Sequence, residues 1–274
     1  DSSMTVSVIF STYNSEAWLE KVIIGFSVQT FKDFEIIIAD DGSREATKNV
    51  IDKLRTEIDN PIIHVWQEDN GFQKSQILNK AILASTSDYL IFTDGDCIPR
   101  EDFVQAHINA REEGFFLSGG YYKLPMDISN AITREAIVTQ NCFNLHWLKS
   151  KGLKWSTKNI KFLTSGLLAK ILNLVTSTNA SWNGHNSSGW KKDLLAINGF
   201  NQDMQYGGQD RELGERLVNK GLKSKQIRYS AICVHLDHKR GYVNEETWKK
   251  NLSIREHTRN NKVIKTLIGI DSNL

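Results

Sequence analysis

The chain has 274 residues, of which 40% are hydrophobic, so it can bury the core of one large domain with an extension. Its 34 Lys and Arg residues nearly balance 32 Asp and Glu residues, and a net charge of +2 argues against recognition of nucleic acid by whole-molecule attraction. Cys97, Cys142 and Cys233 are far apart and odd in number, which argues against a disulfide framework and favours a reducing compartment.

The chain contains no uncharged apolar run of about 20 residues, the length that a membrane-spanning helix needs. Its first residues also lack the basic segment and apolar stretch of a secretory signal. We therefore expect a cytoplasmic protein.

Short β-branched runs alternate with amphipathic stretches in the first half. The runs predict strands at 6–10, 35–40, 62–66 and 88–94, and the stretches between them predict helices at 15–29, 44–57 and 73–85. Because parallel neighbours need a helix-length connection, this order is typical of a mainly parallel sheet. The predicted fold class is α/β, with a Rossmann-like central sheet flanked by helices. Ligands of such sheets bind at the carboxyl ends of the strands.

Residues 136–192 differ in composition from the rest, because they contain no Asp or Glu while Lys residues alternate with Trp147, Trp155 and Phe162. One interpretation is a helical basic insertion that packs on the sheet domain. The other is a basic, aromatic surface that rests on an anionic membrane or a lipid-linked acceptor, which would make the protein peripheral on the inner face of a membrane.

Two carboxylates, Asp94 and Asp96, follow the fourth predicted strand, with Gly95 between them. Like charges this close are costly unless a cation neutralises them. Oxygen ligands of this kind suit Mg²⁺ or Mn²⁺ bound to a diphosphate. The alternative is an ordinary acidic turn.

Polar residues also follow the second predicted strand, at Asp40 and Asp41. A carboxylate at this place can accept a hydrogen bond from a base or a ribose hydroxyl. The run NGFQK (70–74) then precedes a predicted helix, whose amino end with Lys74 could attract phosphate. Each pattern is also compatible with a capped turn.

The second half contributes Gly207, Gly208, Gln209 and Asp210 before an apolar-periodic stretch. Two glycines allow a loop to lie against a ligand, and the start of a helix favours the ionised form of Asp210, which could then accept a proton from an attacking hydroxyl. A helix cap is the structural alternative. Farther on, a strand is predicted at 230–233, and His235 after it could serve as a metal ligand beside the acidic pair.

Together, these segments resemble the inverting family 2 nucleotide-sugar glycosyltransferases, which have the GT-A fold. The segments in chain order are VSVIFSTYN (6–14), DDGS (40–43), TDGDC (93–97), HNSSGWKKDLLAINGFN (185–201), YGGQDRELGERL (206–217) and VHLDH (234–238). The last three resemble a galactosyltransferase-type C-terminal module. Each motif is weak, but their ordered set is specific.

The resemblance implies a role for each matching residue. Asp96 and His235 would hold Mn²⁺ or Mg²⁺, and Asp210 would be the catalytic base. The donor nucleotide would contact Thr12, Tyr13, Asn14, Asp40, Asp41, Lys74, Asn79, Asp94 and Gly95, and the sugars would contact Gly207, Gly208, Gln209 and Trp190. Gln209 departs from the Glu that is common there; it cannot accept a proton at neutral pH, so the acceptor preference stays open.

The implied organisation is a nucleotide-sugar-binding half at 1–120, the helical basic insertion at 121–184, an acceptor-binding and catalytic half at 185–240 and a C-terminal helical extension at 241–274. The implied reaction moves a sugar, from a UDP-hexose or UDP-N-acetylhexosamine, to a hydroxyl of a saccharide or lipid-linked acceptor in cell-surface polysaccharide synthesis. The alternatives are a sugar-nucleotide nucleotidyltransferase and a non-catalytic sugar- or nucleotide-binding module. A Rossmann dehydrogenase is disfavoured, because no Gly-x-Gly-x-x-Gly follows a predicted strand.

Overall fold

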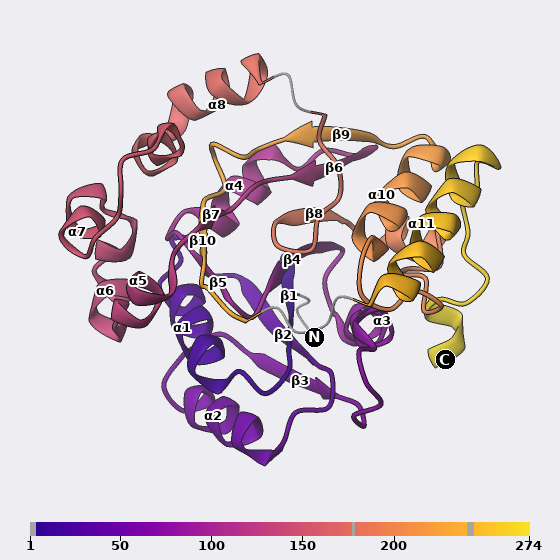
Figure 1. Cartoon of the computed structure of the whole chain (residues 1–274), viewed down its shortest axis with the longest axis horizontal. Coiled ribbons are helices and arrows are strands. Elements are labelled where there is room, and N and C mark those ends of the chain that lie inside the picture. The colour runs from indigo at the N-terminus through magenta and orange to yellow at the C-terminus, as the bar shows by residue number, and fades with distance from the viewer. Residues whose placement is uncertain (1–3, 177–178, 240–243) are drawn as a thin grey trace.

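A seven-stranded sheet forms the centre of the computed structural model, which describes residues 4–176, 179–239 and 244–274 (Figure 1). The strand order is β3-β2-β1-β4-β8-β6-β9. The strands are β1 (Val6–Thr12), β2 (Phe34–Asp40), β3 (Ile62–Trp66), β4 (Tyr89–Asp94), β6 (Phe115–Ser118), β8 (Ser187–Trp190) and β9 (Lys223–Gln226). All run in one direction except β8, which is antiparallel to β4 and β6. The mainly parallel sheet confirms the predicted fold class.

Helices cover both faces of the sheet. Alternate residues of the inner strands point to opposite faces, so each strand contributes side chains to two separate cores. Val8 and Phe10 of β1 pack with α1 (Glu16–Ser27) and α2 (Glu45–Arg55) in one hydrophobic core. Ile9 of the same strand belongs to a second core, which includes residues of α3 (Lys74–Ala84), α9 (Lys191–Ala196) and α10 (Gln209–Lys220). The four strands and three helices predicted up to residue 94 begin and end within two residues of their predicted bounds.

A smaller sheet of three strands, in the order β5-β10-β7, lies at the edge of the large one. Its strands are β5 (Cys97–Pro99), β7 (Tyr122–Lys123) and β10 (Cys233–His235). The antiparallel pairing of β10 with β5 sets His235 opposite Cys97, so it brings the VHLDH segment to the acidic turn after β4. The strand predicted at 230–233 was placed too early, because 228–230 form a turn and pairing starts at Cys233.

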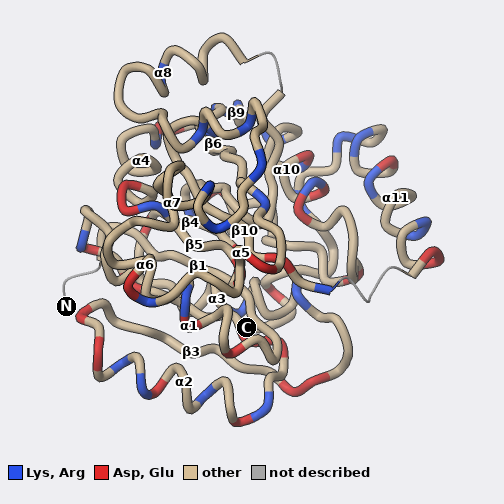
Figure 2. The backbone as a smooth tube through the Cα atoms, turned by 60° about the vertical axis from the view of Figure 1, so that its left-hand side comes forward, with Lys and Arg blue, Asp and Glu red and all other residues tan. Residues whose placement is uncertain are grey.

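Several short helices occupy the middle of the chain. They are α4 (Phe103–Ala110), α5 (Met126–Ala131), α6 (Arg134–Val138), α7 (Leu145–Ser150) and α8 (Gly166–Val175), with 3₁₀ turns at Asn141–Phe143 and Thr157–Leu163. Helix α8 lies at the rim of the molecule in both views (Figure 1 and Figure 2). Of its residues only Ala169 is buried.

Helix α11 (Glu245–Asn260) packs beside α10 on the other side of the molecule (Figure 1), and a 3₁₀ turn at Ile270–Asn273 follows it. Within the described ranges, every helix is too short or too polar to cross a bilayer.

Candidate active site

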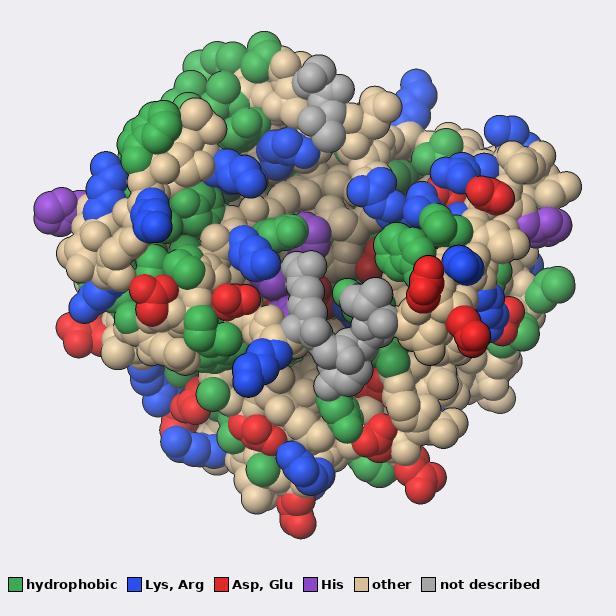
Figure 3. Space-filling model, in the orientation of Figure 1, with side chains coloured by type: hydrophobic (Ala, Val, Ile, Leu, Met, Phe, Trp, Pro, Cys, Tyr) green, Lys and Arg blue, Asp and Glu red, His purple; other side chains and the backbone are tan. Residues whose placement is uncertain are grey.

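The carboxyl ends of β1, β2 and β4 meet at one edge of the sheet, as expected for parallel neighbours. The register sets Thr12 opposite Asp40 and Ser11 opposite Asp94. The face shown in Figure 3 is hollowed near its centre, and histidine and acidic side chains lie at the floor of the hollow. The residues predicted from the strand ends therefore converge.

A buried ammonium group lies among three carboxylates. Lys74 Nζ, from the first turn of α3, lies 2.8 Å from Asp94 Oδ1. Burial alone would lower the pKa of Lys74, but the charges of Asp94, Asp210 and Asp96 outweigh burial and raise it. Lys74 is therefore a fixed positive charge that joins the end of β4 to the start of α10.

Asp210 is the second residue of α10 and follows a loop that needs glycine, because Gly207 has φ 106° and Gly208 has φ 82°. Burial raises the pKa of Asp210 to about 6; Lys74 opposes this rise and Asp94 adds to it. Asp210 Oδ1 is buried without a hydrogen-bond partner in the described part of the chain. A carboxylate with this pKa and a vacant acceptor atom can serve as a general base near neutral pH.

The loop before α10 is held by hydrogen bonds from α11 and from Gln209. The amide nitrogen of Asn251 in α11 donates to the carbonyl oxygen of Gly207 at 2.6 Å, and Gln209 Oε1 accepts from Gly207 N at 2.9 Å. A Cβ on Gly207 would lie 2.6 Å from the Trp248 ring. The side chain of Gln209 is buried, and its hydrogen bond with Gly207 N helps to hold the loop in place.

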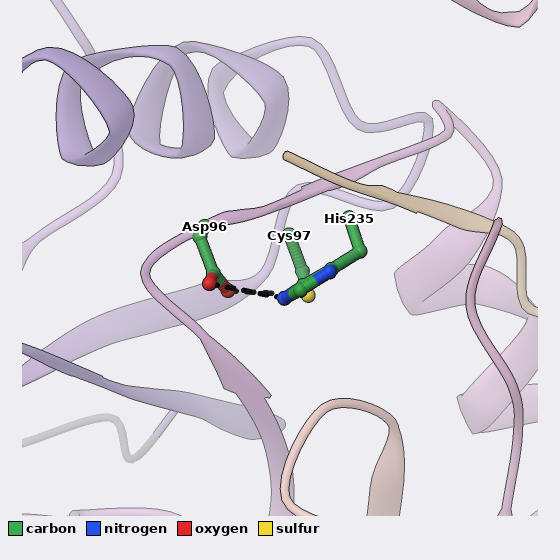
Figure 4. Close-up of side chains that lie close together, drawn as sticks. All are labelled: Asp96, Cys97 and His235. Atoms are coloured by element: carbon green, nitrogen blue, oxygen red, sulfur yellow. Dashed lines mark hydrogen bonds and ion pairs between the residues drawn. The ribbon is translucent and has the colours of Figure 1, made fainter. Parts of the chain in front are cut away.

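The Asp96 carboxylate lies beside two histidine side chains, His235 and His238. Figure 4 shows its contact with His235. Asp96 Oδ2 is 3.0 Å from His235 Nε2 and 3.2 Å from His238 Nε2. Burial would raise the pKa of Asp96, but hydrogen bonds and the charges of both histidines lower it. Ligand atoms of Asp96, Cys97 and His235 lie within 4.8 Å of one another. One carboxylate and two imidazoles fit Mn²⁺ better than the buried Cys97 thiol does, because burial keeps that thiol protonated by raising its pKa.

In a strand that continued past His235, residues 235 and 238 would point to opposite faces. The strand ends at His235, so the chain turns and both rings reach Asp96. The structure also brings His185 to this site. The ring centroid of His185 lies 4.2 Å from that of Tyr121, and the ring centroid of Tyr121 lies 5.2 Å from that of His235. Burial, together with the charges of His235 and Lys74, lowers the pKa of His185 to about 3, so it is neutral. No spacing in the sequence ties 121 and 185 to the acidic pair.

The two carboxylates after β2 are both buried and both occupied. Asp41 accepts from Gln67 Nε2 at 2.7 Å and from the backbone nitrogen of Gln73 at 2.9 Å. Asp40 lies 2.8 Å from His64 Nε2 and accepts from Ser43 N at 2.9 Å. These bonds fix the turn that borders the hollow.

The residues after β1 line the same turn. Asn14 has φ 45° and its side-chain oxygen accepts from Arg44 N at 2.8 Å, so it ties the end of β1 to the start of α2. Tyr13 is 43% exposed, and its hydroxyl donates to Asp69. Thr12 Oγ1 is buried and has no partner in the ranges that are described. Gly95 permits the close approach of the acidic turn, because a Cβ there would lie 2.6 Å from Ser11 O.

Two predicted contact residues lie elsewhere. Asn79 is fully buried, donates to Phe200 O at 2.9 Å and accepts from Phe200 N at 2.8 Å, so its amide is used in holding the 200–202 segment. Trp190 pairs with Tyr89, at the opposite end of β4 from Asp94. Asn79 faces the core, and the antiparallel direction of β8 carries Trp190 away from the hollow, so these positions do not favour the predicted contacts with donor or acceptor.

Family models match most of the chain. The model described as glycosyl transferase family 2 matches residues 7–169, and the one described as the N-terminal domain of galactosyltransferase matches residues 176–239. An uncharacterized glycosyltransferase of Bacillus subtilis, YfnE, is 25% identical over 86% of this chain, and chondroitin synthase of Escherichia coli is 25% identical over 84%. The chain spans 65% and 34% of the lengths of these two relatives.

Solved structures share the fold. Staphylococcus aureus TarS in complex with UDP-GlcNAc superposes with a TM-score of 0.65 at 14% identity, covering 98% of this chain and 69% of that one. A mannosyltransferase of Pyrobaculum calidifontis in complex with GDP-Man and Mn2+ superposes with a TM-score of 0.59 at 17% identity, covering 88% and 59%. The fold is therefore the GT-A type. With more than half of its residues matched by one family model, the chain belongs to glycosyl transferase family 2.

Proposed function

We propose that this glycosyltransferase moves a sugar from a UDP-hexose or UDP-N-acetylhexosamine to a hydroxyl of a saccharide or lipid-linked acceptor, with inversion, in the assembly of a cell-surface polysaccharide. One observation supports the proposal most: Asp210, a buried carboxylate with its pKa raised to about 6, shares Lys74 with the acidic turn after β4. In this proposal Asp210 is the general base, and Lys74 beside it offsets the charge of the diphosphate.

The donor end of the hollow is formed by the β1, β2 and β4 ends. In this proposal Asp41 and the 12–14 turn border the nucleoside, and Lys74 offsets the charge of the phosphates. Asp96 and His235 would hold Mn²⁺ or Mg²⁺, with His238 as a third group beside them. When bound, the cation neutralises charge on the diphosphate.

The chemical step is a single displacement. The acceptor oxygen forms a bond to the anomeric carbon while the bond from that carbon to the diphosphate oxygen breaks, and the electron pair leaves with the nucleoside diphosphate. The hydroxyl proton passes to Asp210. Because the acceptor attacks from the side opposite the leaving group, the anomeric configuration inverts. General-base help of this kind is typically worth about 10²–10⁴ in rate.

Incubation of the protein with Mn²⁺ and a panel of UDP-sugars, in the presence of saccharide acceptors, tests this function. We expect release of UDP and an inverted glycosidic product by NMR. Pyrophosphate exchange would instead mark a nucleotidyltransferase, and tight UDP binding without turnover would mark a binding module. Either result would overturn the proposal.

The basic segment supports a second element of the proposal, contact with an anionic membrane. Residues 136–192 lack acidic side chains, and α8 exposes Leu167 (74%), Leu174 (85%) and Val175 (70%) on one side. Trp155 is 80% exposed nearby in sequence. Apolar side chains flanked by lysines suit the interface of an anionic bilayer.

Co-sedimentation with vesicles of anionic or of zwitterionic lipid checks this contact. We expect binding to the anionic vesicles alone and its loss in Leu174→Asp. Leu267→Asp is the matched control, since Leu267 is 95% exposed outside this segment. Equal partition of the wild type between both vesicle types would rule the contact out.

A further inference from the structure

A cavity of about 330 Å³ lies beside the hollow, between α10, α11 and the segment that contains Trp182. None of the donor-side residues named above lines it. Its walls include Arg211 and Glu215 of α10, Arg255 and Arg259 of α11, and Lys262. The cavity is therefore a separate compartment next to the site already described.

The charge of the cavity is strongly positive, because four cationic side chains face one carboxylate. Arg255 is neutralised by Glu215, whose Oε1 accepts from Arg255 Nη2 at 2.7 Å and from Nε at 3.0 Å. For Arg211, Arg259 and Lys262, no ion pair is formed with any residue that the structure describes. All three side chains are exposed to solvent, so they can pair with an anion that enters the cavity.

The cavity lies close to Asp210, because the next residue in the chain, Arg211, lines it. Asp210, Gly214 and Val218 are spaced by four residues, so they lie in one row along α10, and the last two line the cavity. On the facing segment, a Cβ on Gly184 would lie 2.7 Å from Asp210 Oδ2, and Trp182, two residues before it, lines the cavity. The cavity therefore lies next to Asp210 along α10.

Two buried polar atoms of lining residues lack partners in the described ranges, namely Trp182 Nε1 and Glu215 Oε2. One is a donor and the other an acceptor, and a buried polar atom without a partner costs about 1–3 kcal/mol. Saccharide hydroxyls both donate and accept, whereas a simple inorganic anion supplies acceptors only. The polar groups of the cavity therefore match a saccharide that also bears negative charge.

We propose that this cavity binds the acceptor, and that the acceptor is an anionic saccharide whose carboxylates or phosphodiesters lie against Arg211, Arg259 and Lys262. The inference rests on the proposed transferase function and names its acceptor class. It also assigns these three residues to acceptor selection, since Arg211 of α10, Arg259 of α11 and Lys262 after α11 all line the cavity.

Binding of three oligosaccharide probes of equal length, measured calorimetrically on the full chain, tests the proposal. The probes are a uronate-containing oligosaccharide, a phosphodiester-linked one and a neutral one. We expect at least tenfold tighter binding of one anionic probe than of the neutral probe, with affinity falling as salt rises. Whichever anionic probe binds identifies the source of the charge.

Arg259→Glu should weaken the anionic probe at least tenfold, and Lys262→Glu repeats the test if the first variant folds poorly. Lys53→Glu is the matched control, because it makes the same charge change on α2, away from the cavity. UDP release from the UDP-sugar alone should be unchanged in all variants, whereas its absence in the wild type would refute the proposed function instead. Equal affinity for neutral and anionic probes, or equal loss in Lys53→Glu and Arg259→Glu, would overturn the anionic-acceptor assignment.

Discussion

The ammonium group of Lys74 lies 2.8 Å from Asp94 and within the electrostatic field of Asp210, so a single cation lies between the end of β4 and the start of α10. Lys74 opens α3, whereas Asp210 opens α10. The packing of these helices on one face of the sheet therefore sets the distance between the two chemical functions.

The first prediction concerns the pH dependence of catalysis. Asp210 must be ionised to accept a proton, and its pKa is raised to about 6 by burial. We expect kcat/KM to be constant above this pH and to fall tenfold per pH unit well below it, as the carboxyl becomes protonated. Because Lys74 opposes the rise, Lys74→Met should shift the fall to a higher pH. An unshifted profile in that variant would mean that Lys74 does not act on the base.

The second prediction concerns stability. Asp210 has a higher pKa in the folded protein than the ordinary aspartate value of 3.8, so ionising it disfavours the folded state. This penalty is absent below about pH 4, grows between about pH 4 and 6 and is complete above that range. Asp210→Asn should therefore raise the free energy of unfolding at pH 8 by roughly 1–3 kcal/mol, and by little at pH 3.5. Urea titrations at both pH values measure the difference; destabilisation at pH 8 would contradict it.

The third prediction concerns the metal. Chelation with EDTA should abolish UDP release and weaken UDP binding, and Mn²⁺ should restore both. Asp96→Asn should weaken UDP binding in Mn²⁺ at least tenfold, because it removes the carboxylate that both histidines face. In metal-free buffer the variant and the wild type should bind UDP alike. If UDP affinity were the same with and without Mn²⁺ in the wild type, Asp96 would have no role in metal binding.

The fourth prediction concerns the support of the α10–α11 pair. Glu212 and Arg216 form a fully buried ion pair at 2.8 Å, and Thr258 of α11 donates to Glu212 at 2.7 Å. Removing one partner leaves an uncompensated buried charge, so Glu212→Ala should cost about 3–5 kcal/mol of unfolding free energy. The exposed pair Lys48–Asp52 has the same spacing, and Asp52→Ala should leave the free energy of unfolding almost unchanged, because solvent screens an exposed ion pair. Similar losses in the two variants would show that burial does not govern the effect.

The sequence alone predicted the strands and helices of the first half, since local apolar periodicity determines them and the sheet then brings their polar ends together. Asp94, Asp96 and Asp210 were singled out because each lies at or near the end of a strand or the start of a helix, where a ligand can approach, and their roles remain predictions. Donor-binding roles for Thr12, Tyr13, Asn14 and Asp41 remain predictions, with their positions beside the hollow in their favour.

Other features of the structure could not be read from the sequence, because they depend on how distant parts of the chain pack together. The direction of β8 places Trp190 at the far end of the sheet, and no local pattern gives that direction. Asn79 matched a motif but faces the core, where the backbone of Phe200 occupies its amide. His185 and Tyr121 reach the site only through the pairing of distant strands, and the basic cavity needs two helices and a connecting segment to be packed before it exists.

Asp210→Asn is the most direct test of the central claim, that a buried carboxylate on α10 is the base of a sugar transfer. Calorimetry with UDP-sugar and Mn²⁺, paired with single-turnover product formation, separates binding from chemistry. We predict donor affinity within about threefold of wild type and a rate lower by about 10²–10⁴. A variant that binds the donor and transfers the sugar at the wild-type rate would contradict the role of Asp210.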